Sequence, residues 1–295
     1  MAQRLRPRRG LSPVGGERSD GDGRSAGSHE LLAAAAERIG APPGGTPVRP
    51  RVGVDLGTAS CVLVVLDSAD RTDRPVWVES AGSGALHDGV VVDFARAVAT
   101  VRELRERACD ALGTELTRAA TAHPPCIPVA DARACTYVCE AAGFDEVTLV
   151  DEVTAAQRTL EISEGAVVDV GGGSTGVGVF RDGRLERLDD RPGGGHHLDL
   201  VLAGALGVDV AEAERFKRER PADALPILVP GLHRIAESIR AMTHGTDADL
   251  PLHLAGGALM IPRAGDVLAQ YLQRTVVTHP HALLITPLGI ARSAP

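Results

Sequence analysis

Two short loops in the chain combine an aspartate with glycines and hydroxyl side chains, a combination suited to binding a phosphate together with a metal ion. Consecutive backbone N–H groups in such turns bind anions, and glycines let the chain approach phosphate oxygens. A carboxylate beside a phosphate is repelled unless a cation lies between them, and Mg²⁺ held through its water ligands meets that need. The residues concerned are Asp55, Gly57, Thr58 and Ala59 in the first loop and Asp169, Gly171, Gly172, Gly173, Ser174 and Thr175 in the second. Either loop alone is equally well explained as an ordinary hairpin turn, but the pair predicts one magnesium-bound nucleotide.

Three further segments carry candidate site residues. Glu152 stands where a predicted strand runs into a helix, so its carboxylate can point into a cleft. The alternative is that Glu152 only stabilises the helix dipole. Gly256 and Gly257 follow a predicted strand and leave room for a flat ligand against the backbone. The segment 286–291 predicts a small-residue helix that packs closely.

The elements that would position these residues occur in two similar sets. Hydrophobic periodicity predicts the pattern strand, aspartate, glycine turn, strand twice, around Asp55 and around Asp169. Strands are predicted at 52–56, 61–66, 76–79, 147–150, 166–170, 176–180, 184–188 and 252–255, and helices at 94–112, 129–142, 152–160, 196–206, 209–219, 228–243, 262–273 and 287–292. The repetition indicates two α/β lobes, 51–163 and 164–295, that face each other across a cleft.

Residues 1–50 have a different character and are predicted to be an N-terminal extension. Residues 1–27 are rich in Arg, Gly, Ser and Pro, which favours disorder. A short amphipathic helix is expected over 28–39, capped by Ser28 and ended by Gly40, before a linker at 41–47. One interpretation is a docking helix that resembles the encapsulation peptides of microcompartment enzymes. The other is that the helix packs on its own domain.

Composition narrows the functional classes. The net charge is −8 and aromatic residues make up 2% of the chain, which argues against nucleic-acid binding. No apolar run approaches the about 18 residues that a membrane span needs, and the N-terminus lacks a secretory signal, so a cytoplasmic protein is expected. The cysteine count of five argues against a disulfide framework. Cys135 and Cys139, near His123, are a weak metal candidate, and core packing is the better explanation for them.

Taken together and in this order, the motifs resemble the actin-like ATPase superfamily. DLGTAS at 55–60, DVGGGST at 169–175 and LAGGALMIP at 254–262 match its phosphate and adenosine motifs, and DEVTAA and TPLGIA match its two connecting helices. Further stretches at 87–94, 194–197, 200–204 and 212–217 are similar to the EutJ family of ethanolamine utilization proteins, described as chaperone-like. The implied fold is α/β, the two-lobed actin-like ATPase (ribonuclease H-like) fold with reduced inserted subdomains.

The resemblance implies roles for individual residues. Asp55 and Asp169 would hold the hydration shell of Mg²⁺, and Glu152 would act on the attacking water. The residues implied to contact ATP or ADP are Gly57, Thr58, Ala59, Gly171, Gly172, Gly173, Ser174, Thr175, Gly194, Gly195, Gly256, Gly257 and Ala258. His196 and His197 replace acidic residues of the chaperones, and they either face the γ-phosphate or cap a helix.

Two departures from the chaperone pattern qualify the expected function. Residues 59–120 contain no lysine to contact phosphate, and the chain ends four residues after Ala291, without a peptide-binding domain. Slow hydrolysis is therefore expected. The resemblance implies an ATP-binding assembly or remodelling factor whose partners are ethanolamine-pathway enzymes or microcompartment shell proteins. A small-molecule kinase and a non-hydrolysing nucleotide-bound scaffold remain alternatives.

Overall fold

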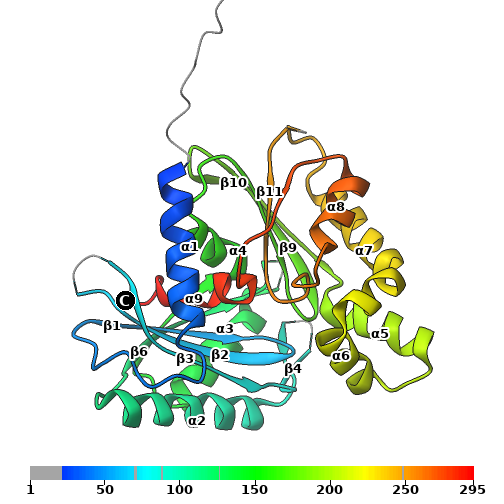
Figure 1. The fold of residues 1–295 in the computed structure, drawn as a ribbon. Coiled ribbons are helices and arrows are strands. Elements are labelled where there is room, and N and C mark those ends of the chain that lie inside the picture. The colour runs from blue at the N-terminus through cyan, green and yellow to red at the C-terminus, as the bar shows by residue number, and fades with distance from the viewer. Residues whose placement is uncertain (1–21, 70–71, 88, 126, 248) are drawn as a thin grey trace, which may run out of the picture.

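The computed structural model describes residues 22–295 except 70, 71, 88, 126 and 248. The described chain forms two lobes, each built on a five-stranded sheet, with two helices lying between the sheets (Figure 1). The predicted disorder of residues 1–21 falls outside the described residues.

The first lobe has the strand order β3-β2-β1-β6-β7. Its elements are β1 (Pro50–Leu56), β2 (Ser60–Asp67), β3 (Arg74–Gly82), the short β4 (Leu86–His87) and β5 (Val90–Val91), α2 (Phe94–Leu112), β6 (Arg118–His123), α3 (Val129–Ala141) and β7 (Glu146–Asp151). Strands β1 to β3 are antiparallel, and β6 and β7 continue the sheet parallel to β1. The short β4–β5 pair stands between β3 and α2, so the inserted subdomain of this lobe is small.

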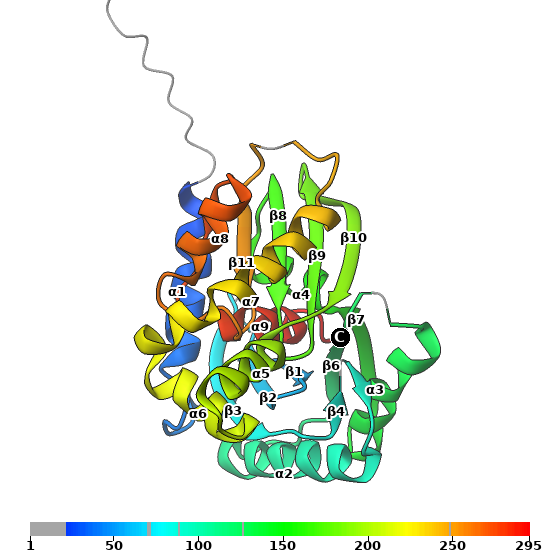
Figure 2. The same cartoon turned by 90° about the vertical axis from the view of Figure 1, so that its right-hand side faces the viewer.

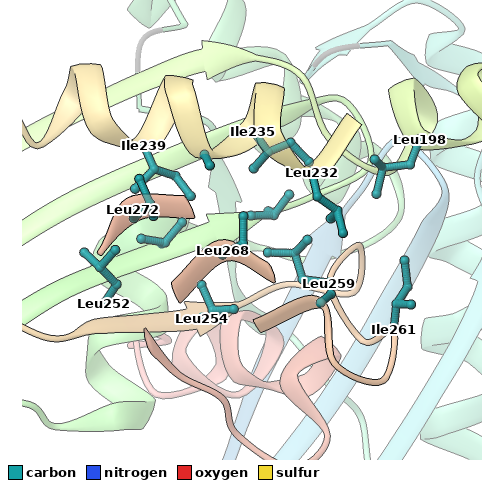
Figure 3. Close-up of a cluster of buried hydrophobic side chains, with 14 of the residues drawn as sticks. Leu198, Leu232, Ile235, Ile239, Leu252, Leu254, Leu259, Ile261, Leu268 and Leu272 are labelled. Atoms are coloured by element: carbon teal, nitrogen blue, oxygen red, sulfur yellow. The ribbon is translucent and has the colours of Figure 1, made fainter. Parts of the chain in front are cut away.

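The second lobe repeats the same arrangement with the order β10-β9-β8-β11-β12. Its elements are β8 (Gly165–Val170), β9 (Ser174–Arg181), β10 (Arg184–Pro192), α5 (Gly195–Leu206), α6 (Val210–Glu219), α7 (Pro221–Met242), β11 (Leu252–Ala255), α8 (Ala264–Leu272) and β12 (Val276–Val277). Leucine and isoleucine side chains of α7, α8 and β11 meet in its core (Figure 3). The sequence repeat therefore corresponds to a structural repeat.

Strand β2 shows why the first sheet is hydrophobic on both faces. Cys61, Leu63 and Val65 point into the core beneath α2 and α3. The alternate residues Val64 and Leu66 point into a second core between the lobes. Successive side chains of a strand face opposite sides, so a strand covered on both faces is a continuous apolar run.

Two helices connect the lobes and lie between the two sheets (Figure 2). They are α4 (Glu152–Leu160) and α9 (Ile285–Ala291), the second preceded by a 3₁₀ turn, η1 (Ala282–Leu284). A Cβ atom added at Gly289 would lie 1.6 Å from the carbonyl oxygen of Ala155, so the two helices cross with backbone against backbone. We call this crossing of α4 and α9, where the two lobes meet, the hinge.

Strand β6 and helix α7 differ from the sequence prediction for identifiable reasons. Strand β6 was not predicted, because its alanine-rich residues 118–123 show no clear strand pattern. Helix α7 begins at Pro221 and not at 228, and it contains Pro226 and Pro230. Proline is tolerated in the first turn, and burial of Leu228 and Leu232 outweighs the cost of the internal prolines.

The N-terminal helix begins earlier than predicted and ends at Ala36, before the predicted end at Gly40. Helix α1 spans Asp22–Ala36, so 22–27 are helical and Ser28 lies inside the helix, where its hydroxyl donates to the Leu160 carbonyl at 3.3 Å. Leu31 and Leu32 are buried in the core between the lobes. The helix runs along both lobes on the side away from α5 and α6 (Figure 1). The linker also contacts the body, since the Gly44 N–H donates to the Val76 carbonyl. The structure thus has the helix packed on its own chain.

Leu32→Ala is expected to destabilise the protein by about 2–5 kcal/mol, because the Leu32 side chain on α1 is fully buried against the body of the protein. Glu30→Ala, at an exposed position of the same helix, is the matched control and should change stability by less than about 0.5 kcal/mol. Urea unfolding of both variants measures the difference. Equal midpoints for the two would show that α1 is not docked in solution.

Candidate functional site

The ends of β1 and β8 bring two acidic side chains together between the lobes. Asp55 lies near the end of β1 and Asp169 near the end of β8. Burial and the negative charge of Asp169 raise the pKa of Asp55 to about 7. Burial also raises the pKa of Asp169 to about 6, against the effect of a hydrogen bond from Thr286. The Asp169 carboxylate is thus close enough to oppose the ionisation of Asp55.

The two hairpin turns that follow these strands are closed by equivalent backbone hydrogen bonds, and their tips contact each other. The Gly57 N–H donates to the Ser60 carbonyl at 3.0 Å, and the Gly171 N–H donates to the Ser174 carbonyl at 3.1 Å. A Cβ atom added at Gly172 would lie 3.1 Å from the Thr58 Cβ atom. The tips of the two predicted phosphate loops therefore face each other across the space between the lobes.

The glycine pair at the start of α5 is tied to the second loop. The Gly195 N–H donates to the Gly171 carbonyl at 2.9 Å, and the His196 N–H donates to the Gly172 carbonyl at 2.8 Å. A Cβ atom at Gly194 would lie 2.3 Å from the Gly171 oxygen, so only glycine fits there. Gly194 and Gly195 are thereby placed directly beside the second turn.

The two glycines that follow β11, Gly256 and Gly257, lie beside Asp169 and the start of the second loop. Gly256 has φ +82°, and a Cβ atom there would lie 2.5 Å from the Asp169 Oδ1 atom. The Ala258 N–H donates to the Val170 carbonyl at 3.2 Å. Gly257 lies against the Leu283 side chain. The predicted adenosine segment and the second phosphate loop thus form one continuous wall.

Glu152 is the first residue of α4 and lies close to both aspartates. Burial, followed by the charges of Asp169 and Asp55, raises the pKa of Glu152 well above its ordinary value. The helix is capped by Asp151, whose Oδ1 atom accepts from the Thr154 N–H at 2.7 Å. Asp151 therefore caps the helix, and the Glu152 carboxyl lies with the acidic cluster.

The oxygen donors of this cluster fit a hydrated divalent cation. Three neighbouring carboxyl groups with raised pKa values repel one another, and a cation between them would relieve the repulsion. Within the described residues, no three His, Cys, Asp or Glu side chains converge closely enough to coordinate a metal ion by themselves. A cation here would accordingly keep water ligands, which is the usual behaviour of Mg²⁺.

Two residues of this region were missed by the sequence analysis. Asp190 of β10 belongs to the acidic cluster, since burial raises its pKa to about 6 and Asp169 adds to the rise. The single lysine of the chain, Lys217, lies with its Nζ atom 2.5 Å from the Asp199 Oδ1 atom and 3.3 Å from the Gly195 carbonyl oxygen. Lys217 could have been noticed in the sequence because it is the only lysine of the chain. No sequence signal pointed to Asp190.

The remaining candidates lie at the margin of the site or away from it. The backbone of His196 contacts the second loop, while the His197 side chain is exposed. Cys135 and Cys139 are buried in the core of the first lobe, as core packing requires. Burial raises the pKa of the Cys135 thiol to about 12.

Among the described residues, the helices are too short or too polar to span a bilayer.

Comparison with known proteins agrees with this architecture. Residues 83–202 match the MreB/Mbl protein family model. The ethanolamine utilization protein EutJ of Salmonella typhimurium (strain LT2) is 36% identical over 244 residues, which cover 82% of this chain and 85% of that protein. The crystal structure of EutJ from Carboxydothermus hydrogenoformans superposes with a TM-score of 0.85 at 37% identity, covering 91% of this chain and 98% of that one. MreB 5 of Spiroplasma citri bound to AMPPNP shares the fold at 15% identity, with a TM-score of 0.67 over 82% of this chain and 95% of that one. The resemblance noted in the motifs is confirmed: the chain belongs to the EutJ family of ethanolamine utilization proteins and has the actin-like ATPase fold.

Proposed function

We propose that the protein binds ATP or ADP with Mg²⁺ between its two lobes. The observation that carries this proposal is the pair of matched hairpin turns, each preceded by a buried aspartate, whose tips approach each other at Gly172 and Thr58. Backbone N–H groups of such turns bind phosphate oxygens. A solved relative of the same fold, MreB 5 of Spiroplasma citri, is bound to ADP.

Each group of residues has a distinct task in this proposal. Asp55 and Asp169 would hold Mg²⁺ through its water ligands, and the ion would neutralise phosphate charge. The glycines of the two turns and Gly194, Gly195, Gly256, Gly257 and Ala258 would form the wall against the nucleotide. Glu152 would accept a proton from the attacking water. Burial and the charges of Asp169 and Asp55 raise the pKa of Glu152 and so disfavour its ionised form until those charges are neutralised, which favours slow hydrolysis.

We further infer that nucleotide-dependent movement of the lobes serves a chaperone-like assembly or remodelling role in ethanolamine utilization. Family membership supports the pathway. The two-lobed fold with a narrow hinge supports closure around a ligand. The clients would be ethanolamine-pathway enzymes or microcompartment shell proteins. ATP-dependent recovery of such an enzyme from dilution-induced aggregation tests the role, and recovery equal with and without nucleotide would contradict it.

Glu152→Gln is expected to retain nucleotide binding within about twofold and to lose about 100-fold or more of any ATP turnover, because the amide cannot accept a proton. Calorimetric titration and phosphate release measure the two quantities. Glu140→Gln, at an exposed position of α3, is the matched control. A wild-type protein that binds neither ATP nor ADP would overturn the proposed function. Tight binding without turnover would favour the scaffold alternative.

A further inference from the structure

We propose that Thr286, on the hinge helix α9, is a positioning residue that holds Asp169 in the orientation needed for Mg²⁺. The inference rests on the proposed nucleotide function. It gives a residue of helix α9 a part in ordering the metal site, acting through Asp169, which neither the motif pattern nor the family comparison assigns.

The hydrogen bond from Thr286 to Asp169 is short and buried. The Thr286 Oγ1–H group donates to the Asp169 Oδ2 atom at 2.5 Å, and the two residues are 4% and 6% exposed. Hydrogen bonds from a hydroxyl to a carboxylate are short and stronger than neutral ones. The Thr286 hydroxyl is therefore a strong donor to this oxygen.

The other oxygen of the same carboxylate lies beside Gly256. A Cβ atom at position 256 would stand 2.5 Å from the Asp169 Oδ1 atom, so glycine leaves the room that this carboxylate occupies. Rotation of the carboxylate would break the hydrogen bond from Thr286. Asp169 therefore lies between the predicted adenosine segment on one side and helix α9, which donates the orienting hydrogen bond, on the other.

The same helix also packs on the strand that carries Asp55. A Cβ atom at Gly53 would lie 2.4 Å from the Ala291 nitrogen and 2.7 Å from the Pro287 carbonyl oxygen. Gly53 stands two residues before Asp55 in β1. Helix α9 thus contacts the Asp55 strand through its backbone and the Asp169 carboxylate through a side chain. A change in the angle between the lobes would alter both acids together.

A second threonine offers a comparison for a purely structural role. The Thr159 hydroxyl is fully buried and donates to the Ile285 carbonyl at 2.7 Å, one residue before Thr286. It stabilises the same hinge, but its partner is a backbone carbonyl and not a metal-site carboxylate. Loss of the Thr159 hydroxyl should therefore affect stability alone.

The test compares Thr286→Val, Thr286→Ser and Thr159→Val. Calorimetry measures the Kd of ADP with Mg²⁺ and with a chelator, and the ratio of the two Kd values reports the contribution of the metal. Thr286→Val is expected to reduce that ratio about 10-fold or more, while the affinity in chelator stays within about threefold, since residues that orient metal ligands affect metal affinity to this extent. Thr286→Ser should keep the wild-type ratio, and Thr159→Val should keep it despite a lower unfolding temperature. Thr286→Ala replaces the valine variant if the latter does not fold.

The outcomes separate this inference from the proposed function. A wild-type ratio in Thr286→Val, or an equal loss in Thr159→Val, would overturn the positioning role while leaving nucleotide binding intact. Wild-type protein that bound no ADP in either condition would overturn the proposed function, and the positioning role with it.

Discussion

Asp55→Asn is expected to weaken the binding of Mg²⁺–ADP about 10- to 100-fold and, at the same time, to make the nucleotide-free protein more stable at neutral pH. The loss of affinity follows because the amide carries no charge to hold the ion. The gain in stability follows because burial and the negative charge of Asp169 both disfavour the ionised Asp55 carboxylate in the folded state. Function and stability should therefore change in opposite directions at this residue.

The stability effect has a defined pH window. The folded-state pKa of Asp55 is about 7, above its ordinary value of 3.8, so ionisation disfavours the folded state. Its contribution is fully present below about pH 4 and is lost as the pH rises through about 7. The stability gained by Asp55→Asn over the wild type should grow across this range, to roughly 2–4 kcal/mol at pH 7.5. Urea unfolding of both proteins at pH 4.5 and 7.5 measures it.

Two histidines titrate in an overlapping range with the opposite sign, which is why the variant must be compared with the wild type at each pH. Burial lowers the pKa of His253 and of His279 to about 4. Their contribution to stability is present above about pH 6.5 and is lost as the pH falls. This contribution cancels in the difference. Asp110→Asn, on the exposed face of α2, is the control. A difference that stays constant with pH would mean that Asp55 is not buried beside Asp169.

The site was predictable from the sequence to the extent that it is made of local turns. Asp55 and Asp169 precede glycine turns whose chemistry is visible in a few consecutive residues, and the structure places the tips of those turns together. Asp190 and Thr286 reach the same place only through strand register and helix packing. Asp190 enters because β10 pairs with β9 so that Asp190 lies opposite Gly176. Nothing in the neighbouring sequence marks Asp190, and the motif at 286–291 predicts a closely packed helix without indicating the contact of Thr286 with Asp169.

The fold was predictable where periodicity is strong and less so where tertiary packing decides. Helices 94–112 and 152–160 begin and end where predicted, because each has an aspartate cap and a clear buried face. The amphipathic pattern of α1 identified a helix, but the same pattern suits a partner protein and the chain's own lobes equally. Burial of Leu32 in the core between the lobes, which no local pattern encodes, decides between them.

Gly289→Ala is expected to be among the most damaging single-methyl changes in the protein. The added Cβ atom would stand 1.6 Å from the Ala155 carbonyl oxygen and 2.4 Å from its carbon, so both neighbours are backbone and no rotamer change can relieve the overlap. Helices α4 and α9 would have to separate, and every residue of α9 is buried. We expect a loss of about 3 kcal/mol or more in the free energy of unfolding, at the upper end of the cost of overpacking.

Gly204→Ala supplies the matched control, because it makes the same chemical change inside another helix. Position 204 in α5 has open space around the added methyl group, so alanine should stabilise the protein by about 0.5–1 kcal/mol through helix propensity. Urea unfolding of the two variants therefore gives effects of opposite sign. Since α9 also carries Thr286, a folded Gly289→Ala protein should in addition lose part of its Mg²⁺-dependent ADP affinity, whereas Gly204→Ala should keep it. A Gly289→Ala protein with wild-type stability would show that the hinge helices do not cross as closely as the structure indicates, and the proposed coupling between α9 and the acidic cluster would lose its basis.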